Sequence, residues 1–282
     1  MSVMYLRGGT PLEGELAVHG AKNSVLPILS ACLLARGPVT LTNCPRLTDV
    51  TAALNILRHL GCRAEQEGHT ITVDPTGAAG SAISEGQMRS MRSSIIFLGP
   101  LLARTGEAHL TYPGGCELGP RPIDLHLAAI RALGCQVNEE QGIHCQGRPV
   151  GGEVQLSLPS VGATENAILC AVGAAGTTTI SNAAREPEIG DLQSFLNSLG
   201  ANVRGAGSST ITVEGGRGRS GGEYAVMGDR IVAATLLSAA AAAGGRVRLS
   251  GVDWRHLATV LRNPPRARRG AEAAQRFRRG EG

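Results

Sequence analysis

The chain has 282 residues, of which 42% are hydrophobic and only 2% aromatic, and its formal net charge is +4. This length allows a large core in one or two domains, and the scarcity of aromatic rings argues against a base-stacking nucleic-acid platform. Residues 263–282 hold six arginines and two glutamates, so they carry the whole net charge of +4 and the other 262 residues are neutral. A basic surface for nucleic acid is therefore not predicted.

Neither a membrane span nor a secretion signal is predicted. No apolar run is long enough to cross a bilayer, and the first residues lack a basic segment that leads into an apolar core. The seven cysteines are scattered without the paired spacing of a metal site. We therefore expect a cytoplasmic protein with reduced thiols, most of them small core residues, and with no metal and no organic cofactor.

Three stretches of the chain follow one pattern. In residues 49–62, 122–135 and 188–201, apolar residues recur at helical spacing and a glycine follows the last leucine, as at the C-terminal end of a helix. Alternating segments such as 69–73 and 209–213 come next and are typical of strands. One helix-and-strand unit used repeatedly indicates an α/β fold built from repeats.

A fourth unit begins near Val252 and stops before its expected leucine and glycine. Two prolines, Pro264 and Pro265, would break a helix there, and the composition changes to Arg, Ala, Gly and Pro. A solvated basic tail and out-of-frame sequence both explain residues 262–282, and we favour the second. In either case we expect this tail to be disordered.

A glycine-flanked thiol is the most distinctive local feature. Cys116 follows Gly114 and Gly115, and Arg121 lies shortly before the predicted helix. A cation and a helix N-terminus both favour thiolate over thiol, and an arginine can grip a phosphate or carboxylate with paired donors. Taken alone, the motif leaves open a reactive cysteine and a buried, inert one.

Several ordered motifs together resemble the enolpyruvyl transferases, in particular the branch that uses UDP-N-acetylglucosamine. The resemblance is nearly collinear from Met1 to about Leu261. The motifs that carry it are residues 21–27, 91–94, 113–126, 159–166, 183–189, 205–211 and 229–231.

The resemblance implies an inside-out α/β barrel with two similar domains of three units each. Residues 21–228 would form one complete domain, which carries the cysteine loop. Residues 1–20 and 229–261 would be fragments of the other, so the chain would be truncated at its C-terminal end.

The resemblance also implies an activity. The family branch transfers the enolpyruvyl group of phosphoenolpyruvate to the 3-hydroxyl of UDP-N-acetylglucosamine, the first committed step of peptidoglycan synthesis, which serves cell-wall growth, cell shape and cell division. Cys116 matches the family's general acid and the thiol attacked by fosfomycin. Partners would be these two small molecules, with no nucleic acid and no membrane, and the protein would be a monomer. The residues that match substrate-binding positions are Lys22, Asn23, Arg92, Arg121, Pro122, Ile123, Asp124, Leu125, Ser160, Val161 and Gly162.

Each binding assignment has a structural alternative. Lys22 could be a solvated lysine at a helix start and Asn23 an N-cap, while Arg92 could pair with a surface carboxylate. Asp124 could simply favour the positive end of its helix. Residues 160–162 could be an ordinary turn from strand to helix, with Thr164 as the helix cap.

Alternatives to the whole function are a non-catalytic remnant that binds a UDP-sugar and the sister enzyme 5-enolpyruvylshikimate-3-phosphate synthase. The resemblance places the family's catalytic aspartate and several arginines beyond the matching part of this chain. We therefore expect activity at least ~10³-fold below that of a complete enzyme, by the scale of single-group losses.

Overall fold

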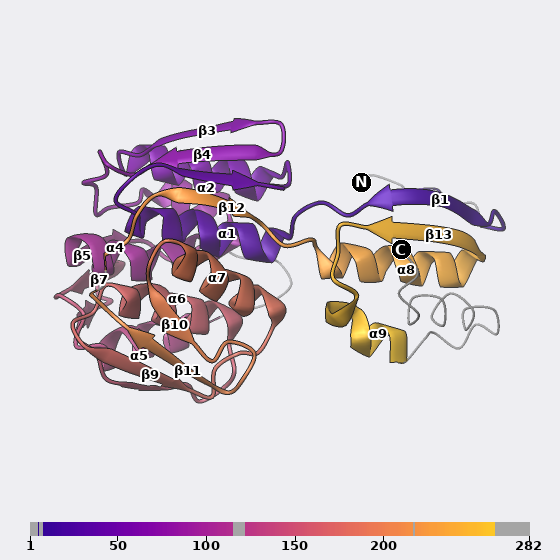
Figure 1. Ribbon diagram of the computed structural model, residues 1–282. Coiled ribbons are helices and arrows are strands. Elements are labelled where there is room, and N and C mark those ends of the chain that lie inside the picture. The colour runs from indigo at the N-terminus through magenta and orange to yellow at the C-terminus, as the bar shows by residue number, and fades with distance from the viewer. Residues whose placement is uncertain (1–4, 6–7, 115–121, 217, 263–282) are drawn as a thin grey trace. The chain divides into compact units, whose positions relative to one another are not determined.

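The computed structural model describes residues 5, 8–114, 122–216 and 218–262 (Figure 1). Contacts between Cα atoms divide the chain into two compact units, residues 22–226 and residues 1–21 with 227–282. Each unit is described below by itself.

Three repeats make up the unit of residues 22–226. Each repeat has a buried helix, a first strand, an amphipathic helix and an antiparallel pair of strands. The first consists of α1 (Lys22–Ala31), η1 (Cys32–Leu34), β2 (Val39–Thr42), α2 (Thr48–His59), β3 (Arg63–Glu67) and β4 (Thr70–Asp74). The second consists of α3 (Glu85–Ser90), η2 (Arg92–Phe97), α4 (Leu98–Thr105), β5 (Glu107–Leu110), α5 (Asp124–Ala132), β6 (Gln136–Asn138) and β7 (Ile143–Gln146). The third consists of β8 (Glu153–Gln155), α6 (Val161–Val172), β9 (Thr177–Ser181), α7 (Pro187–Ser198), β10 (Asn202–Arg204) and β11 (Thr210–Glu214), after which β12 (Gly222–Ala225) follows.

The three sheets of this unit share one topology. Their strand orders are β12-β2-β4-β3, β5-β7-β6 and β8-β9-β11-β10. In two sheets an additional strand pairs in parallel with the first strand of the repeat, β12 with β2 and β8 with β9. In the sheet of β5 a single parallel bridge between Ala82 and His109 occupies the equivalent edge.

The predicted amphipathic helices and strands are confirmed. α2, α5 and α7 overlap the three predicted helical stretches, and Gly61, Gly134 and Gly200 follow them with φ values of 98°, 81° and 99°. β4 and β11 match the predicted alternating segments. Positive φ is costly for a side chain with a Cβ, which explains why glycine recurs at these three ends.

α1, α4 and α6 form the core of this unit. Nearly every residue of these helices is buried, and the sheets lie around them (Figure 1). Six of the seven cysteines lie in the described chain, and all six are buried and unpaired, as expected. Burial of each large aliphatic side chain contributes about 1.5–3 kcal/mol, so these three helices supply a large share of the apolar stabilisation.

The other unit is a two-stranded parallel sheet with helices. It consists of β1 (Leu12–Ala17), α8 (Arg230–Ala243), β13 (Gly245–Ser250), η3 (Trp254–Leu257) and α9 (Ala258–Arg262). Its buried core is small, comprising Val18, Ala233, Leu249 and Leu257. No helix in the described chain combines the length and the apolar character needed to cross a membrane.

Candidate functional site

α1 carries the first two predicted binding residues at its N-terminal end. The helix begins at Lys22, whose Nζ lies 2.5 Å from Oδ2 of Asp49 on α2. This ion pair orients the ammonium group. The Lys22 side chain is 46% exposed, so it remains accessible to a ligand. Asn23 is exposed and lies inside the first turn, so the alternative assignment of Asn23 as an N-cap is wrong.

The next residue, Ser24, fixes the start of α1 against the rest of the unit. Its buried hydroxyl donates to a carboxylate oxygen of Asp191 on α7. The hydroxyl of Tyr224 on β12 donates to the other oxygen of Asp191 at 2.6 Å. Burial, followed by this contact, raises the pKa of Tyr224 well above its ordinary value of 10, so its hydroxyl remains a donor. Two elements therefore hold the backbone that presents Lys22 and Asn23.

Arg92 is half-buried and opens η2. Cys116 and Arg121 lie outside the described residues. Before that segment, Gly114 packs on α3: its amide donates to the carbonyl of Met88 at 3.3 Å, and a Cβ there would lie 2.7 Å from the carbonyl oxygen of Arg89. Only glycine allows this approach, which holds the backbone at Gly114 against α3.

Residues 122–125 lead into α5. Pro122 is exposed, Ile123 and Leu125 are half-buried, and the exposed Asp124 is the first residue of the helix. A carboxylate in the first turn interacts favourably with the helix dipole. The position of Asp124 therefore agrees with the structural alternative, in which it only stabilises the start of its helix.

Residues 160–162 form the start of α6. Ser160 is the N-cap, and its hydroxyl accepts a hydrogen bond from the amide of Ala163 at 3.4 Å. Thr164, the helix cap in the structural alternative, lies inside the helix instead, where its hydroxyl accepts from the amide of Ala184 at 3.0 Å. Gly162 lies against the ring of His126, since a Cβ there would be 2.9 Å from Cε1.

One buried amide joins the elements that present these segments. Oδ1 of Asn166 on α6 accepts from the amide of Gly99 on α4 at 2.8 Å. Nδ2 of Asn166 donates to the carbonyl of Ile95 on η2 at 2.9 Å and to Nδ1 of His126 on α5 at 2.7 Å. Burial lowers the pKa of His126 to about 4, so its ring is neutral and its Nδ1 accepts. Sequence reasoning missed Asn166 and His126 as organisers of the site.

A buried carboxyl group lies near the start of the same helix. Glu165 is 6% exposed, and its Oε1 has no hydrogen-bond partner. Burial, followed by the charges of Glu188 and Glu186, raises the pKa of Glu165 well above its ordinary value and so favours its neutral form. Its sequence signal was an acidic residue just before the apolar run of residues 167–172.

These contacts bring together some of the predicted residues. η2 contacts both α1 and α6, and α5 contacts α6, so Lys22, Arg92, residues 122–125 and residues 160–162 stand on one set of interlocked helices. Cations at two helix starts can bind the anionic groups of a ligand. Among the described residues, no group of three or more His, Cys, Asp or Glu side chains has the arrangement of a metal site.

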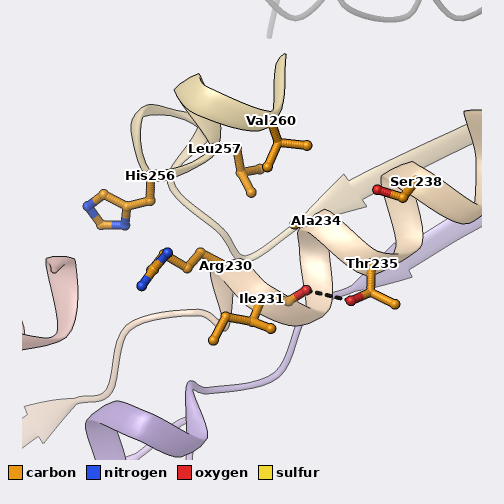
Figure 2. A pocket seen from close by; sticks show the side chains of 8 residues that line it. All are labelled: Arg230, Ile231, Ala234, Thr235, Ser238, His256, Leu257 and Val260. Carbon is orange, nitrogen blue, oxygen red and sulfur yellow. Dashed lines mark hydrogen bonds between the residues drawn. The ribbon is translucent and has the colours of Figure 1, made fainter. Parts of the chain in front are cut away.

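A different pocket lies in the smaller unit, between α8 and the segment of η3 and α9 (Figure 2). It has a volume of about 360 Å³, and no predicted site residue lines it. In Figure 2 Arg230 and His256 extend to the same side, and Thr235 donates to the carbonyl of Ile231 at 2.8 Å. Its described lining residues are Arg230, Ile231, Ala234, Thr235, Ser238, His256, Leu257 and Val260.

Residues 6–263 match the family model described as EPSP synthase (3-phosphoshikimate 1-carboxyvinyltransferase). The chain belongs to this enolpyruvyl transferase family. In solved structures the same fold is found in the enolpyruvyl transferase NikO from Streptomyces tendae, with a TM-score of 0.75, 23% identity, and coverage of 86% of this chain and 58% of that one. EPSP synthase from Acinetobacter baumannii gives a TM-score of 0.68 and 23% identity over 88% of this chain and 57% of its own. The expected α/β enolpyruvyl transferase fold is confirmed.

Curated relatives are much more similar in sequence to this enolpyruvyl transferase chain. UDP-N-acetylglucosamine 1-carboxyvinyltransferase 2 from Caldanaerobacter subterraneus subsp. tengcongensis is 48% identical over 263 residues, which is 93% of this chain and 63% of the relative. UDP-N-acetylglucosamine 1-carboxyvinyltransferase 1 from Symbiobacterium thermophilum is 48% identical over 261 residues, or 90% of this chain and 59% of the relative. The chain thus spans about three fifths of the length of these relatives.

Proposed function

We propose that this enolpyruvyl transferase chain acts in the transfer of the enolpyruvyl group from phosphoenolpyruvate to the 3-hydroxyl of UDP-N-acetylglucosamine. The observation that carries the proposal is its 48% identity to relatives named for this reaction, against 23% to a solved EPSP synthase. The likeness to the solved EPSP synthase supports the common fold, whereas the closer sequence relatives favour the UDP-sugar as acceptor.

The reaction requires a proton donor, a base and anion-binding groups. The methylene carbon of phosphoenolpyruvate takes up a proton, and the sugar oxygen bonds to the neighbouring carbon as the 3-hydroxyl loses its proton. The carbon–oxygen bond to phosphate then breaks, and a proton leaves the methyl group to restore the double bond. We propose Cys116 as the donor of the first proton, and cations that stabilise the developing charge accelerate both steps.

The described binding residues have distinct proposed tasks. Lys22 and Arg92 would bind phosphate or carboxylate oxygens, with the Lys22 ammonium oriented by Asp49. Residues 122–125 and 160–162 would contact the nucleotide, and Ser160 caps the first turn of α6 there. Arg121 and Asn23 complete the proposed set.

Ligand titration tests the choice of acceptor. The purified 282-residue chain should bind UDP-N-acetylglucosamine in isothermal titration calorimetry and should not bind shikimate 3-phosphate. Arg92→Ala should weaken binding by roughly 10-fold or more, because a charged hydrogen bond is lost. Arg63→Ala, which removes an arginine with an 87% exposed side chain on β3, is the matched control and should leave the affinity unchanged.

A phosphate-release assay tests catalysis. Release that requires both substrates and disappears in Cys116→Ala would support the proposed transfer. Binding of the UDP-sugar with no release would support the non-catalytic alternative. Binding of shikimate 3-phosphate in place of the UDP-sugar would contradict the proposed acceptor.

A further inference from the structure

Two histidines face each other on the sheet β5-β7-β6, and neither is one of the proposed binding residues. His109 on β5 and His144 on β7 are direct partners in the antiparallel register, so their side chains lie on the same face. The alternate residues Ala108 and Cys145 are buried, so the histidines occupy the more accessible face. Their Nδ1 atoms lie 3.1 Å apart, and the ring planes meet at 88° with centres 4.8 Å apart.

The other nitrogen of each ring has an acceptor as its partner. Nε2 of His109 lies 2.5 Å from Oε1 of Glu107, and Nε2 of His144 lies 3.2 Å from the carbonyl oxygen of Gln141. A carboxylate oxygen and a backbone carbonyl oxygen are both acceptors, so each Nε2 is the donor in its contact. Both Nε2 atoms therefore carry hydrogen.

This assignment has a direct consequence for the facing nitrogens. A neutral imidazole with hydrogen on Nε2 has a lone pair on Nδ1, so two lone pairs point into a 3.1 Å gap. Two acceptors at this distance repel each other unless a cation or a shared proton lies between or beside them. If the two nitrogens pointed straight at each other, the ring centres would lie farther apart than the observed 4.8 Å. At least one lone pair therefore points to the side of the line that joins the two Nδ1 atoms.

The arrangement has the features of a pair of metal ligands. Histidines that bind metals usually donate their second ring nitrogen to a carboxylate or a backbone carbonyl, which sets the tautomer and orients the ring. With metal–nitrogen bonds of about 2.0–2.1 Å, neighbouring ligand nitrogens lie about 2.9–3.4 Å apart for angles between a right angle and the tetrahedral angle. The observed 3.1 Å lies within this range.

We propose that His109 and His144 form a site for a divalent transition-metal ion of the Ni²⁺, Cu²⁺ and Zn²⁺ class. The ion would bind through the two facing Nδ1 atoms, with water in its remaining positions. Imidazole nitrogen favours these ions over Mg²⁺ and Ca²⁺, which prefer oxygen. Glu107 acts as a positioning residue that orients His109. The site is independent of the proposed transferase function.

Titration of the untagged chain with Ni²⁺ tests the site. Calorimetry measures the binding, at a pH where histidine is neutral. The wild-type chain should bind one more Ni²⁺ than His144→Gln. Glu107→Gln should keep the site but weaken it by roughly 10-fold, because the ring of His109 loses its carboxylate partner. His59→Gln removes an exposed histidine of α2 and should bind like the wild type. Circular dichroism should show that all variants are folded.

A second readout separates ligation from a general effect on the fold. With the diamagnetic ion Zn²⁺, the ¹⁵N resonances of the two Nδ1 atoms should shift, whereas those of His59 should not. Binding should weaken in acid, because protons compete with the metal ion for the same nitrogens. Equal metal uptake by the wild type and His144→Gln, or no uptake by the wild type, would overturn the proposal.

Discussion

Asn166 shows how a single buried side chain can organise a candidate site. Its amide satisfies groups on η2, α4 and α5, the elements next to Arg92 and residues 122–125. Leaving a buried polar group unpaired costs about 1–3 kcal/mol, so the three contacts strongly favour one packing of these helices. The positions of the proposed binding residues thus depend on a side chain that need not contact a ligand.

The neutral ring of His126 makes the stability of the protein dependent on pH. Its pKa is about 4 in the folded chain, against an ordinary value of 6.5, so the unfolded chain takes up a proton first as the pH falls. The contribution of His126 is therefore complete above about pH 6.5 and is lost toward pH 4, by about 3 kcal/mol in total. Urea unfolding across this range should show the loss in the wild type.

The control for this prediction is His126→Gln, which keeps a polar side chain and does not titrate. Glu165 has the opposite sign, because its raised pKa gives stability that is present below its ordinary value of 4.5 and is lost as the pH rises through the folded value. Both proteins contain Glu165, so its contribution cancels when the free energy of unfolding of the variant is subtracted from that of the wild type. An equal pH dependence in the two proteins would contradict the assignment to His126.

At the scale of elements, the three amphipathic helices end in the same way for the same reason. Each terminal glycine has a positive φ, but the surroundings differ. A Cβ on Gly134 would meet no atom within 4 Å, whereas one on Gly200 would lie 2.8 Å from the carbonyl oxygen of Gly218. The two positions therefore separate the cost of the backbone conformation from the cost of a steric clash.

Gly134→Ala should lower the free energy of unfolding by about 1 kcal/mol, the cost of a left-handed conformation for a residue with a Cβ. Gly200→Ala should cost clearly more, because two backbone segments must also move apart. Urea unfolding of both variants beside the wild type measures the difference. Equal losses in the two variants would show that the close approach at Gly200 adds nothing to the loss in free energy of unfolding.

At the scale of the whole molecule, the two units differ in how much they bury. α6 is buried from Ala163 to Val172, whereas Ala233 is the buried residue of α8 among those described. Segments with few buried apolar contacts open locally at lower free energy than the core. The smaller unit should therefore be the first to open.

Hydrogen exchange measured by mass spectrometry on the full chain tests this expectation. Amides of α8 and β13 should exchange much faster than those of α6, although all are hydrogen-bonded in regular elements. α1 serves as a second reference from the larger unit, since eight of its residues are buried. Equal protection of α6 and α8 would show that the smaller unit is as stable as the larger.

The sequence by itself determined the local elements and the family. The apolar spacing of α2, α5 and α7, the glycine after each, and the alternation in β4 and β11 are local signals, since each helix or strand has one polar face. α1, α4 and α6 lack such a signal, because a helix buried on all sides has no polar face. The sequence motifs also identified the candidate binding residues, but not how they are held.

Tertiary structure decided the contacts between residues far apart in the chain. The pairing of β12 with β2, the ion pair of Lys22 with Asp49, the Asn166 contacts and the facing His109 and His144 all join separate segments. The sequence around one partner does not indicate the other, because the distance between them depends on how the helices and sheets pack. The sequence shows the chemistry of each side chain, whereas the fold sets its partner, its burial and its protonation.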